Sequence, residues 1–176
     1  VQHRISGRVM ALKMNTMAIH QGNLEQLLDS DQYLSWSVRM GLSLDIARGL
    51  QYLHSRGIFH RDLTSKNCLV RWASGQCTAV VGDFGLAEKI PEYSEESDQE
   101  PLAVVGSPYW MAPEVLRGEV YNEKVDVFAY GIILCEVIAR IQADPDVLPA
   151  QRFEHNAHTP QHTSTQSGFT IWYDVP

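Results

Sequence analysis

Cysteine is scarce in this sequence of 176 residues, and its pattern excludes several classes of protein. The three cysteines, Cys68, Cys77 and Cys135, are odd in number, far apart and in no spacing typical of metal ligands. They exclude a disulfide framework, and we expect all three to be small buried residues in a reducing compartment. The first residues also lack the basic, apolar and small-residue pattern of a signal peptide. Together these absences predict a cytoplasmic location.

Net positive charge and long uncharged apolar runs are lacking as well. The formal net charge of −7 provides no basic field for nucleic acid or for an anionic membrane surface, so we expect neither as a partner. The most apolar run, residues 125–141, contains Asp126, Glu136 and Arg140. Because charges at such positions are costly in lipid, this run predicts a buried core helix rather than a membrane span.

Apolar residues make up 44% of the chain, which is enough for one well-buried core. Residues 8–14 predict a strand that carries Lys13 near its end. From residue 22 the pattern becomes helical, and Asn23 is expected to cap a short helix that extends to about residue 30.

A longer helix and a hairpin are expected next. Apolar residues recur at helical spacing from a start at Ser35 or Ser37 up to Gly57, a natural helix stop. Residues 68–71 and 77–82 are strand-like pieces on either side of a turn, which predicts a pair of strands.

Two stretches lack any periodic apolar pattern. Residues 92–100 are acidic and predict a mobile loop. Residues 150–176 are polar without a sustained period, and we expect a divergent, disordered tail there.

Three short motifs follow one another along the chain. They are a His-Arg-Asp triplet followed by an Asn, an Asp-Phe-Gly triplet and an Ala-Pro-Glu triplet, at residues 60–67, 83–85 and 112–114. In this order, and with Lys13 upstream on a strand, they resemble the signature set of protein kinases. The resemblance implies an α+β, protein kinase-like fold with a mainly helical large lobe.

The residue types suit phosphoryl transfer, which requires alignment and charge stabilisation more than covalent work by the protein. Asp62 is the candidate acceptor of the proton of the attacking hydroxyl. Magnesium prefers oxygen ligands, which Asp83 and the amide of Asn67 can supply. The resemblance implies ATP as the phosphate donor, with Mg²⁺ or Mn²⁺. The resemblance implies that Lys13 neutralises the α- and β-phosphates and that Lys66 offsets the charge of the γ-phosphate.

Other residues of the motifs have structural or regulatory alternatives. His60 is expected to pack behind Phe84 in the core rather than to act as an acid or base. Arg61 is either a solvated charge or, as in related kinases, a receptor for a phosphate on the activation segment. Asp126 would be costly to bury unpaired, and the resemblance implies that it holds the backbone of the His-Arg-Asp loop.

Ser107 lies in the stretch "VVGSPYWMAPE" before Glu114, where related kinases keep a hydroxyl near the catalytic loop. Two roles are open: a hydrogen bond that fixes the substrate platform, or a regulatory phosphorylation site. We expect Ser107, rather than the hydroxyls of residues 93–97, to be the functional one.

Three longer stretches narrow the resemblance to one group of protein kinases. The stretches "HRDLTSKNCLV", "GDFGLAEKIP" and "EKVDVFAYGIILCEVIARIQADPD" are similar to those of the testis-specific protein kinases, relatives of the LIM kinases. That group implies dual specificity for Ser/Thr and Tyr, with cofilin, an actin-depolymerising protein, as substrate and actin regulation as the process.

The chain also departs from this family. No Gly-x-Gly-x-x-Gly loop occurs in the sequence, and only residues 14–22 separate Lys13 from Asn23, where kinases have a helix, strands and the adenine-binding hinge. We therefore expect a partial or alternatively spliced kinase. Residues 1–22 would be a remnant of the small lobe, residues 23–149 a large lobe truncated at its C-terminal end, and residues 150–176 the tail.

Two rival functions follow from these departures. The first is a catalytically impaired kinase fragment that acts as a binding or regulatory module. The second is a small-molecule phosphotransferase, but the stretch before Glu114 argues against it, because small substrates need no peptide platform.

Overall fold

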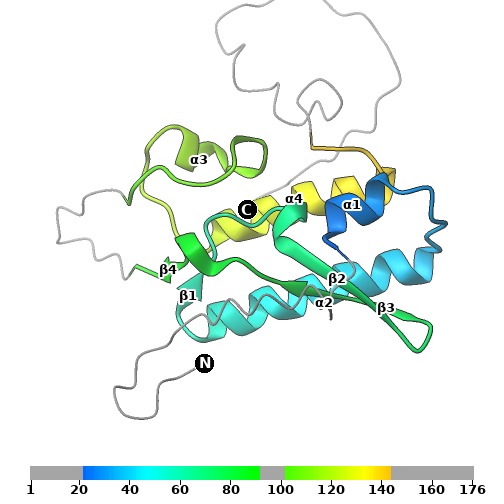
Figure 1. Cartoon of the computed structure of the whole chain (residues 1–176). Coiled ribbons are helices and arrows are strands. Elements are labelled where there is room, and N and C mark those ends of the chain that lie inside the picture. The colour runs from blue at the N-terminus through cyan, green and yellow to red at the C-terminus, as the bar shows by residue number, and fades with distance from the viewer. Residues whose placement is uncertain (1–21, 92–101, 144–176) are drawn as a thin grey trace, which may run out of the picture.

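A computed structural model of the chain describes residues 22–91 and 102–143. The helices are α1 (Leu24–Asp29), α2 (Trp36–Ser55), α3 (Pro113–Leu116) and α4 (Lys124–Ala139). The strands are β1 (Ile58–Phe59), β2 (Cys68–Ala73), β3 (Gln76–Val81) and β4 (Glu88–Lys89). Short 3-10 turns lie at Ser65–Asn67, Phe84–Leu86 and Pro108–Trp110. Figure 1 shows two long helices, with the hairpin near one end and α3 near the other.

The first two helices begin at the caps that the sequence predicts. Asn23 accepts a hydrogen bond from the backbone N–H of Gln26, whose side chain bonds back to the N–H of Asn23, which forms a capping box. Ser35, rather than Ser37, caps α2 by accepting from the N–H of Val38.

Strands β2 and β3 form the predicted hairpin. They pair antiparallel, with Cys68 opposite Val81 and Ala73 opposite Gln76. Ser74 and Gly75 connect them with φ values of 52° and 78°. Positive φ at both positions gives the twist that a tight hairpin requires.

Helices α2 and α4 pack side by side and run antiparallel. His54, near the end of α2, contacts Asp126 in the first turn of α4. Arg39, near the start of α2, donates to the carbonyls of Val137 and Ile138 at the other end of α4. The C-terminal flank of α4 is fixed in turn by Arg140, which donates to backbone carbonyls just after α1.

Two apolar clusters form the interior. The larger lies between α1, α2, α4 and the hairpin, and its fully buried members are Leu24, Leu42, Ile46, Cys68, Ile133 and Val137. The smaller lies under α3 and contains Phe59, Met111, Ala112, Val115, Tyr121 and Val125. Because α4 contributes to both clusters, it links the helical layer to the segment that carries α3.

All three cysteines are free thiols. Burial raises the pKa of the Cys68 thiol to about 12, with a smaller contribution from the charge of Glu136. None of the helices in residues 22–91 and 102–143 is both long and apolar enough to cross a membrane. The predicted strand with Lys13, the acidic loop at residues 92–100 and the tail at residues 150–176 lie outside the described residues.

Candidate active site

The carboxylate of Asp126 holds the backbone of the segment that follows β1. Its Oδ2 accepts a 2.7 Å hydrogen bond from the N–H of His60, and its Oδ1 accepts a 2.9 Å bond from the N–H of Arg61. The Nε2 of His54 lies 2.8 Å from Oδ2. Only 1% of Asp126 is exposed, so these donors, rather than water, compensate its charge.

Arg61 adopts an unusual backbone conformation next to this carboxylate. Its φ of 66° lies in the left-handed region, which is strained for a residue with a Cβ. Its guanidinium donates from Nε to the carbonyl of Leu86 at 2.6 Å and from one NH group to the hydroxyl of Tyr121 at 3.5 Å. With 12% of the side chain exposed, the solvated-charge hypothesis for Arg61 is wrong.

The imidazole of His60 is fully buried and uses both ring nitrogens. Nδ1 accepts from the N–H of Asp62 at 3.3 Å, so Nε2 carries the proton and donates to the carbonyl of Gly82 at 2.9 Å. The ring centroid lies 5.3 Å from that of Phe84. His60 therefore joins the loop to the end of β3 and has no ring nitrogen left for a substrate.

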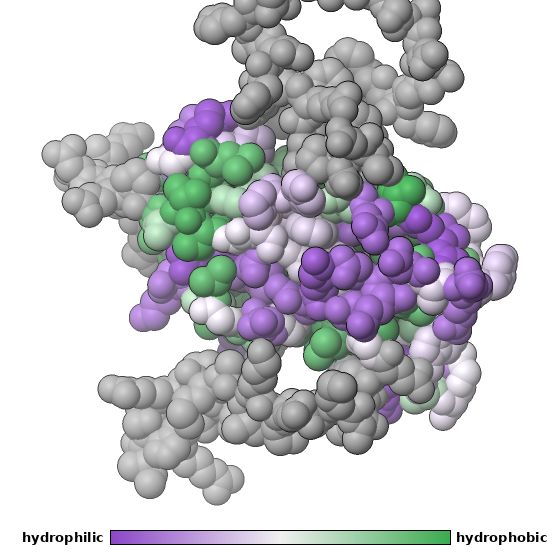
Figure 2. Space-filling view, turned by 45° about the horizontal axis from the view of Figure 1, so that its top comes forward, coloured by the Kyte–Doolittle hydropathy of each residue, from purple (hydrophilic) through white to green (hydrophobic). Residues whose placement is uncertain are grey.

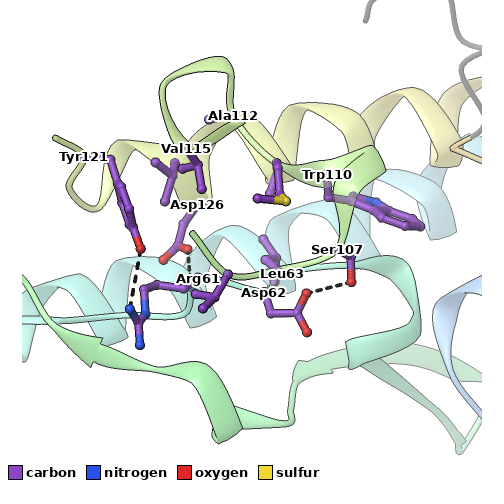
Figure 3. A pocket seen from close by; sticks show the side chains of 13 residues that line it. Arg61, Asp62, Leu63, Ser107, Trp110, Ala112, Val115, Tyr121 and Asp126 are labelled. Carbon is purple, nitrogen blue, oxygen red and sulfur yellow. Dashed lines mark hydrogen bonds between the residues drawn. The ribbon is translucent and has the colours of Figure 1, made fainter. Parts of the chain in front are cut away.

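Asp62 follows at the edge of a small cavity, close to Ser107 (Figure 3). The Ser107 hydroxyl donates to Oδ1 of Asp62 at 2.7 Å. The Asn67 amide donates to the backbone carbonyl of Asp62 at 2.8 Å and lies 3.4 Å from Oδ2. The structure thus brings together three of the predicted site residues, from the loop before β2 and the segment before α3.

Gly106 permits this approach. Its φ is 121°, and a Cβ at this position would lie 2.7 Å from the carbonyl oxygen of Arg61. Real Cβ atoms do not come that close to a backbone oxygen. A glycine before Ser107 therefore allows the two backbones to touch and the hydroxyl to reach Asp62.

Asn67 and Asp83 have the chemistry expected of ligands for a divalent cation. The Nδ2 of Asn67 is directed to Asp62, which leaves the amide oxygen for a cation. The N–H of Gly82 donates to the carbonyl of Asn67 at 2.8 Å, so Asp83 follows directly on a backbone contact with Asn67. Within the described residues, no group of three or more His, Cys, Asp or Glu side chains could hold a metal ion. A small number of protein ligands is typical of a metal ion that is also coordinated by phosphate oxygens.

The remaining predicted site residues are not gathered around Asp62. Lys66 extends toward α1, where its Nζ lies 3.5 Å from a carboxylate oxygen of Glu25. This exposed ion pair is weak and leaves the lysine exchangeable. Glu114 makes no side-chain hydrogen bond or ion pair in the part of the chain that the structure describes. Lys13 lies outside that part.

Glu136 is a buried residue near the site for which the sequence motifs predict no role. This buried carboxylate accepts hydrogen bonds from the hydroxyl of Ser65 at 2.9 Å and from the indole N–H of Trp110 at 3.0 Å. Burial raises its pKa, hydrogen bonds from Trp110, Ser65 and a backbone N–H oppose the rise, and the charge of Glu25 adds to it. The sequence does contain one signal of such a role, a single acidic residue in an otherwise apolar helical stretch, because a buried carboxylate needs hydrogen-bond donors.

The profile of the protein tyrosine and serine/threonine kinases matches residues 5–169. The chain belongs to this family. Its members use ATP with a divalent metal and act on protein substrates. The α+β fold and the order of the motifs agree with membership.

Testis-specific kinases are among the similar curated proteins. The chain is 57% identical over 189 residues to rat "Dual specificity testis-specific protein kinase 1", covering 85% of this chain and 30% of that protein. Mouse "Dual specificity testis-specific protein kinase 2" is also 57% identical, with 85% and 33% covered. "LIM domain kinase 1" of Drosophila melanogaster is 41% identical over 170 residues, with 78% and 13% covered.

The chain thus spans about a third of the length of the testis-specific relatives. Their aligned length of 189 residues also exceeds the 176 residues of the whole chain. The relatives therefore contain residues inside the matched region that have no counterpart here.

Gly106→Ala is expected to destabilise the protein more than Gly75→Ala. Both glycines have positive φ, but a Cβ at Gly75 meets nothing within 4 Å, whereas a Cβ at Gly106 collides with the Arg61 carbonyl. Strain alone costs about 1 kcal/mol, and the collision adds to it at Gly106 only. Urea unfolding of both variants measures the difference, and equal losses would show that the close approach is unimportant.

Glu136→Gln should become more stable relative to wild type as the pH rises above the ordinary glutamate pKa of 4.5. The raised pKa of Glu136 means that its contribution to stability is present below the unfolded-state value and is lost as the pH rises through the folded-state value. Gln carries no charge and avoids this loss. Denaturant unfolding between pH 4.5 and 7 measures the trend.

Glu119→Gln is the control for that experiment. A hydrogen bond from Arg117 lowers the pKa of Glu119, so its contribution to stability is present above the ordinary value of 4.5 and is lost only as the pH falls below it. The difference between Glu119→Gln and wild type should therefore stay nearly constant between pH 4.5 and 7. A difference between Glu136→Gln and wild type that does not change with pH would contradict the assignment of a buried, charged carboxylate.

Proposed function

We propose that the chain is part of a dual-specificity protein kinase of the testis-specific type, in which Asp62 accepts the proton of the substrate hydroxyl. The observation that carries the proposal is the position of the Asp62 carboxylate, between the Asn67 amide and the Ser107 hydroxyl. Family membership supports the same reading. A cofilin-like protein is the proposed substrate, and regulation of actin the proposed process.

The residues divide the work around the transferred phosphate. Ser107 donates to Oδ1 of Asp62, and Oδ2, which lies 3.4 Å from the Asn67 amide, is the oxygen that would accept the proton of the attacking hydroxyl. The Asn67 amide donates to the backbone carbonyl of Asp62, and this bond keeps the Asp62 carboxylate in its orientation. Asn67 and Asp83 would hold Mg²⁺ or Mn²⁺, which supplies charge neutralisation at the phosphates when it is bound.

Three basic residues take the supporting roles. Lys13 is proposed to contact the α- and β-phosphates. Lys66 would leave its weak pair with Glu25 to meet the γ-phosphate. Arg61 is proposed to receive a phosphate on the activation segment, and its guanidinium now donates to the carbonyl of Leu86 and the hydroxyl of Tyr121. For Ser107 two roles are proposed as alternatives, the hydrogen bond to Asp62 or a regulatory phosphorylation site.

Other motif residues are proposed to be structural. His60 with Phe84, and Asp126 through the loop backbone, would keep the catalytic loop in place. Glu114 would close the activation segment.

We propose the domain division 1–22, 23–149 and 150–176 for small-lobe remnant, partial large lobe and tail. The excess of aligned length over chain length supports a deletion relative to the relatives, which we place between Lys13 and Asn23. The adenine-binding hinge would fall within that deletion, which removes part of the surface that encloses a nucleotide. Weak binding of Mg-ATP follows.

A second candidate function is a binding module. Helix α4 is apolar on nearly every face, and such helices are normally covered. Yet Val127 and Ile138 are about half exposed, as are Met40 and Leu44 of α2. Apolar surface also gathers on the side of α3 (Figure 2). These uncovered residues suit contact with a partner protein.

Titration of Mg-ATP into this chain, followed by radiolabel transfer to cofilin, tests the proposal. We expect weak binding and slow transfer that Asp62→Asn lowers by about 100-fold or more, the usual effect of a catalytic base. Asp83→Asn should abolish transfer with the loss of a metal ligand. Asp31→Asn, an exposed aspartate without a site contact, is the control and should match wild type.

Near-normal transfer by Asp62→Asn would contradict the assigned role. Absence of both binding and transfer in wild type would favour the binding module.

A further inference from the structure

One carboxylate joins the two segments that meet at Asp62. Glu136 lies in the last turns of α4 and is 2% exposed. Its Oε1 accepts from Ser65, in the turn between Asp62 and Asn67, and its Oε2 accepts from Trp110, in the turn that Ser107 precedes. The donors therefore come from the catalytic loop and from the segment before α3, here called the platform (residues 104–112).

The contact geometry links Glu136 to the Asp62–Ser107 bond. Ser107 must stay 2.7 Å from Asp62, although the two residues belong to separate segments. The two oxygens of Glu136 are fixed relative to each other by the covalent geometry of a carboxylate. Because Ser65 of the catalytic loop bonds to one oxygen and Trp110 of the platform bonds to the other, the distance between the loop and the platform is fixed at Glu136. The bond between Ser107 and Asp62 joins the same two segments at a second point.

Stability alone does not explain an acid at this position. Burial opposes the charged form of Glu136, and an apolar residue of similar volume commonly serves a core at least as well. The indole N–H of Trp110 is a donor only, and it would lose its acceptor if Glu136 were apolar. Glu136 thus gives the platform a defined position through its bond with Trp110, although burying the carboxylate costs desolvation energy.

We propose that Glu136 is a positioning residue that holds the platform in register with the catalytic loop and so sets the contact between Ser107 and Asp62. Its relevance to phosphoryl transfer rests on the role proposed for Asp62, but the register itself is a structural property. Amide exchange measures the register without any enzymatic activity, so failure here and failure of the kinase proposal are distinguishable.

The test compares amide hydrogen exchange in wild type, Glu136→Leu and Glu136→Gln. The informative amides are those of Trp110, bonded to the Ser107 carbonyl, and Asn67, bonded to the Thr64 carbonyl. Glu136→Leu should raise exchange at both by about tenfold, the effect of losing one hydrogen bond. Glu136→Gln should restore protection, because its oxygen accepts from Trp110 while its NH₂ donates to the Ser65 hydroxyl.

Tyr130→Phe is the matched control. It removes a different bond from α4, the 3.0 Å bond from the Tyr130 hydroxyl to the Ser43 carbonyl of α2. We expect unchanged exchange at Trp110 and Asn67. If Glu136→Leu fails to fold, Trp110→Phe replaces it and should raise exchange on the platform while Asn67 stays protected.

Three results would overturn the proposal. They are unchanged exchange at both amides in Glu136→Leu, a uniform rise across α2 as well as the two segments, or a Gln variant that behaves like the Leu variant.

Discussion

The buried carboxylate of Asp126 is the constraint on which the candidate site depends. One side chain accepts from two successive backbone N–H groups and contacts the imidazole at the end of α2. Such a charge is stable in the interior only while its donors stay in place, so Asp126 holds the end of α2 and the loop against α4. The left-handed backbone at Arg61 persists because these two bonds fix it.

Two further buried polar side chains, His60 and Glu136, hold the neighbouring segments. His60 donates a hydrogen bond to the carbonyl of Gly82, just after β3 and one residue before Asp83, and so joins the loop to that strand. Glu136, on the same helix as Asp126, accepts hydrogen bonds from Ser65 of the loop and Trp110 of the platform, and so joins these two segments. Helix α4 therefore supplies the two acids that organise the loop at residues 60–67, whereas Asp62 itself lies at the edge of a cavity. Rigid support beneath an accessible carboxylate is the arrangement that alignment-dependent chemistry requires.

Much of the fold could be predicted because its signals are local. Asn23 and Ser35 precede helical apolar patterns as caps do, and Ser74 and Gly75 sit between two strand-like pieces. The motif residues could be found for a different reason, since their order along the chain is itself the signal.

The rest could not be predicted because the partners are distant in sequence. The pairing of Lys66 with Glu25, the contacts of Arg61 and the two donors of Glu136 depend on how α1, α3 and α4 pack. Periodicity shows that Glu136 lies in an apolar helix, but not which donors reach it. The collision that Gly106 avoids is likewise visible only when the platform is folded against Arg61.

The most direct test of the central constraint is amide exchange of His60 and Arg61 in wild type and in Asp126→Asn. We expect both amides to be strongly protected in wild type and to lose that protection in the variant, because Asn offers a single acceptor oxygen and opposes one donor with its own NH₂. Amides in the middle of α2 should stay protected. Unchanged exchange at His60 and Arg61, or an equal loss throughout α2, would contradict a loop held by Asp126.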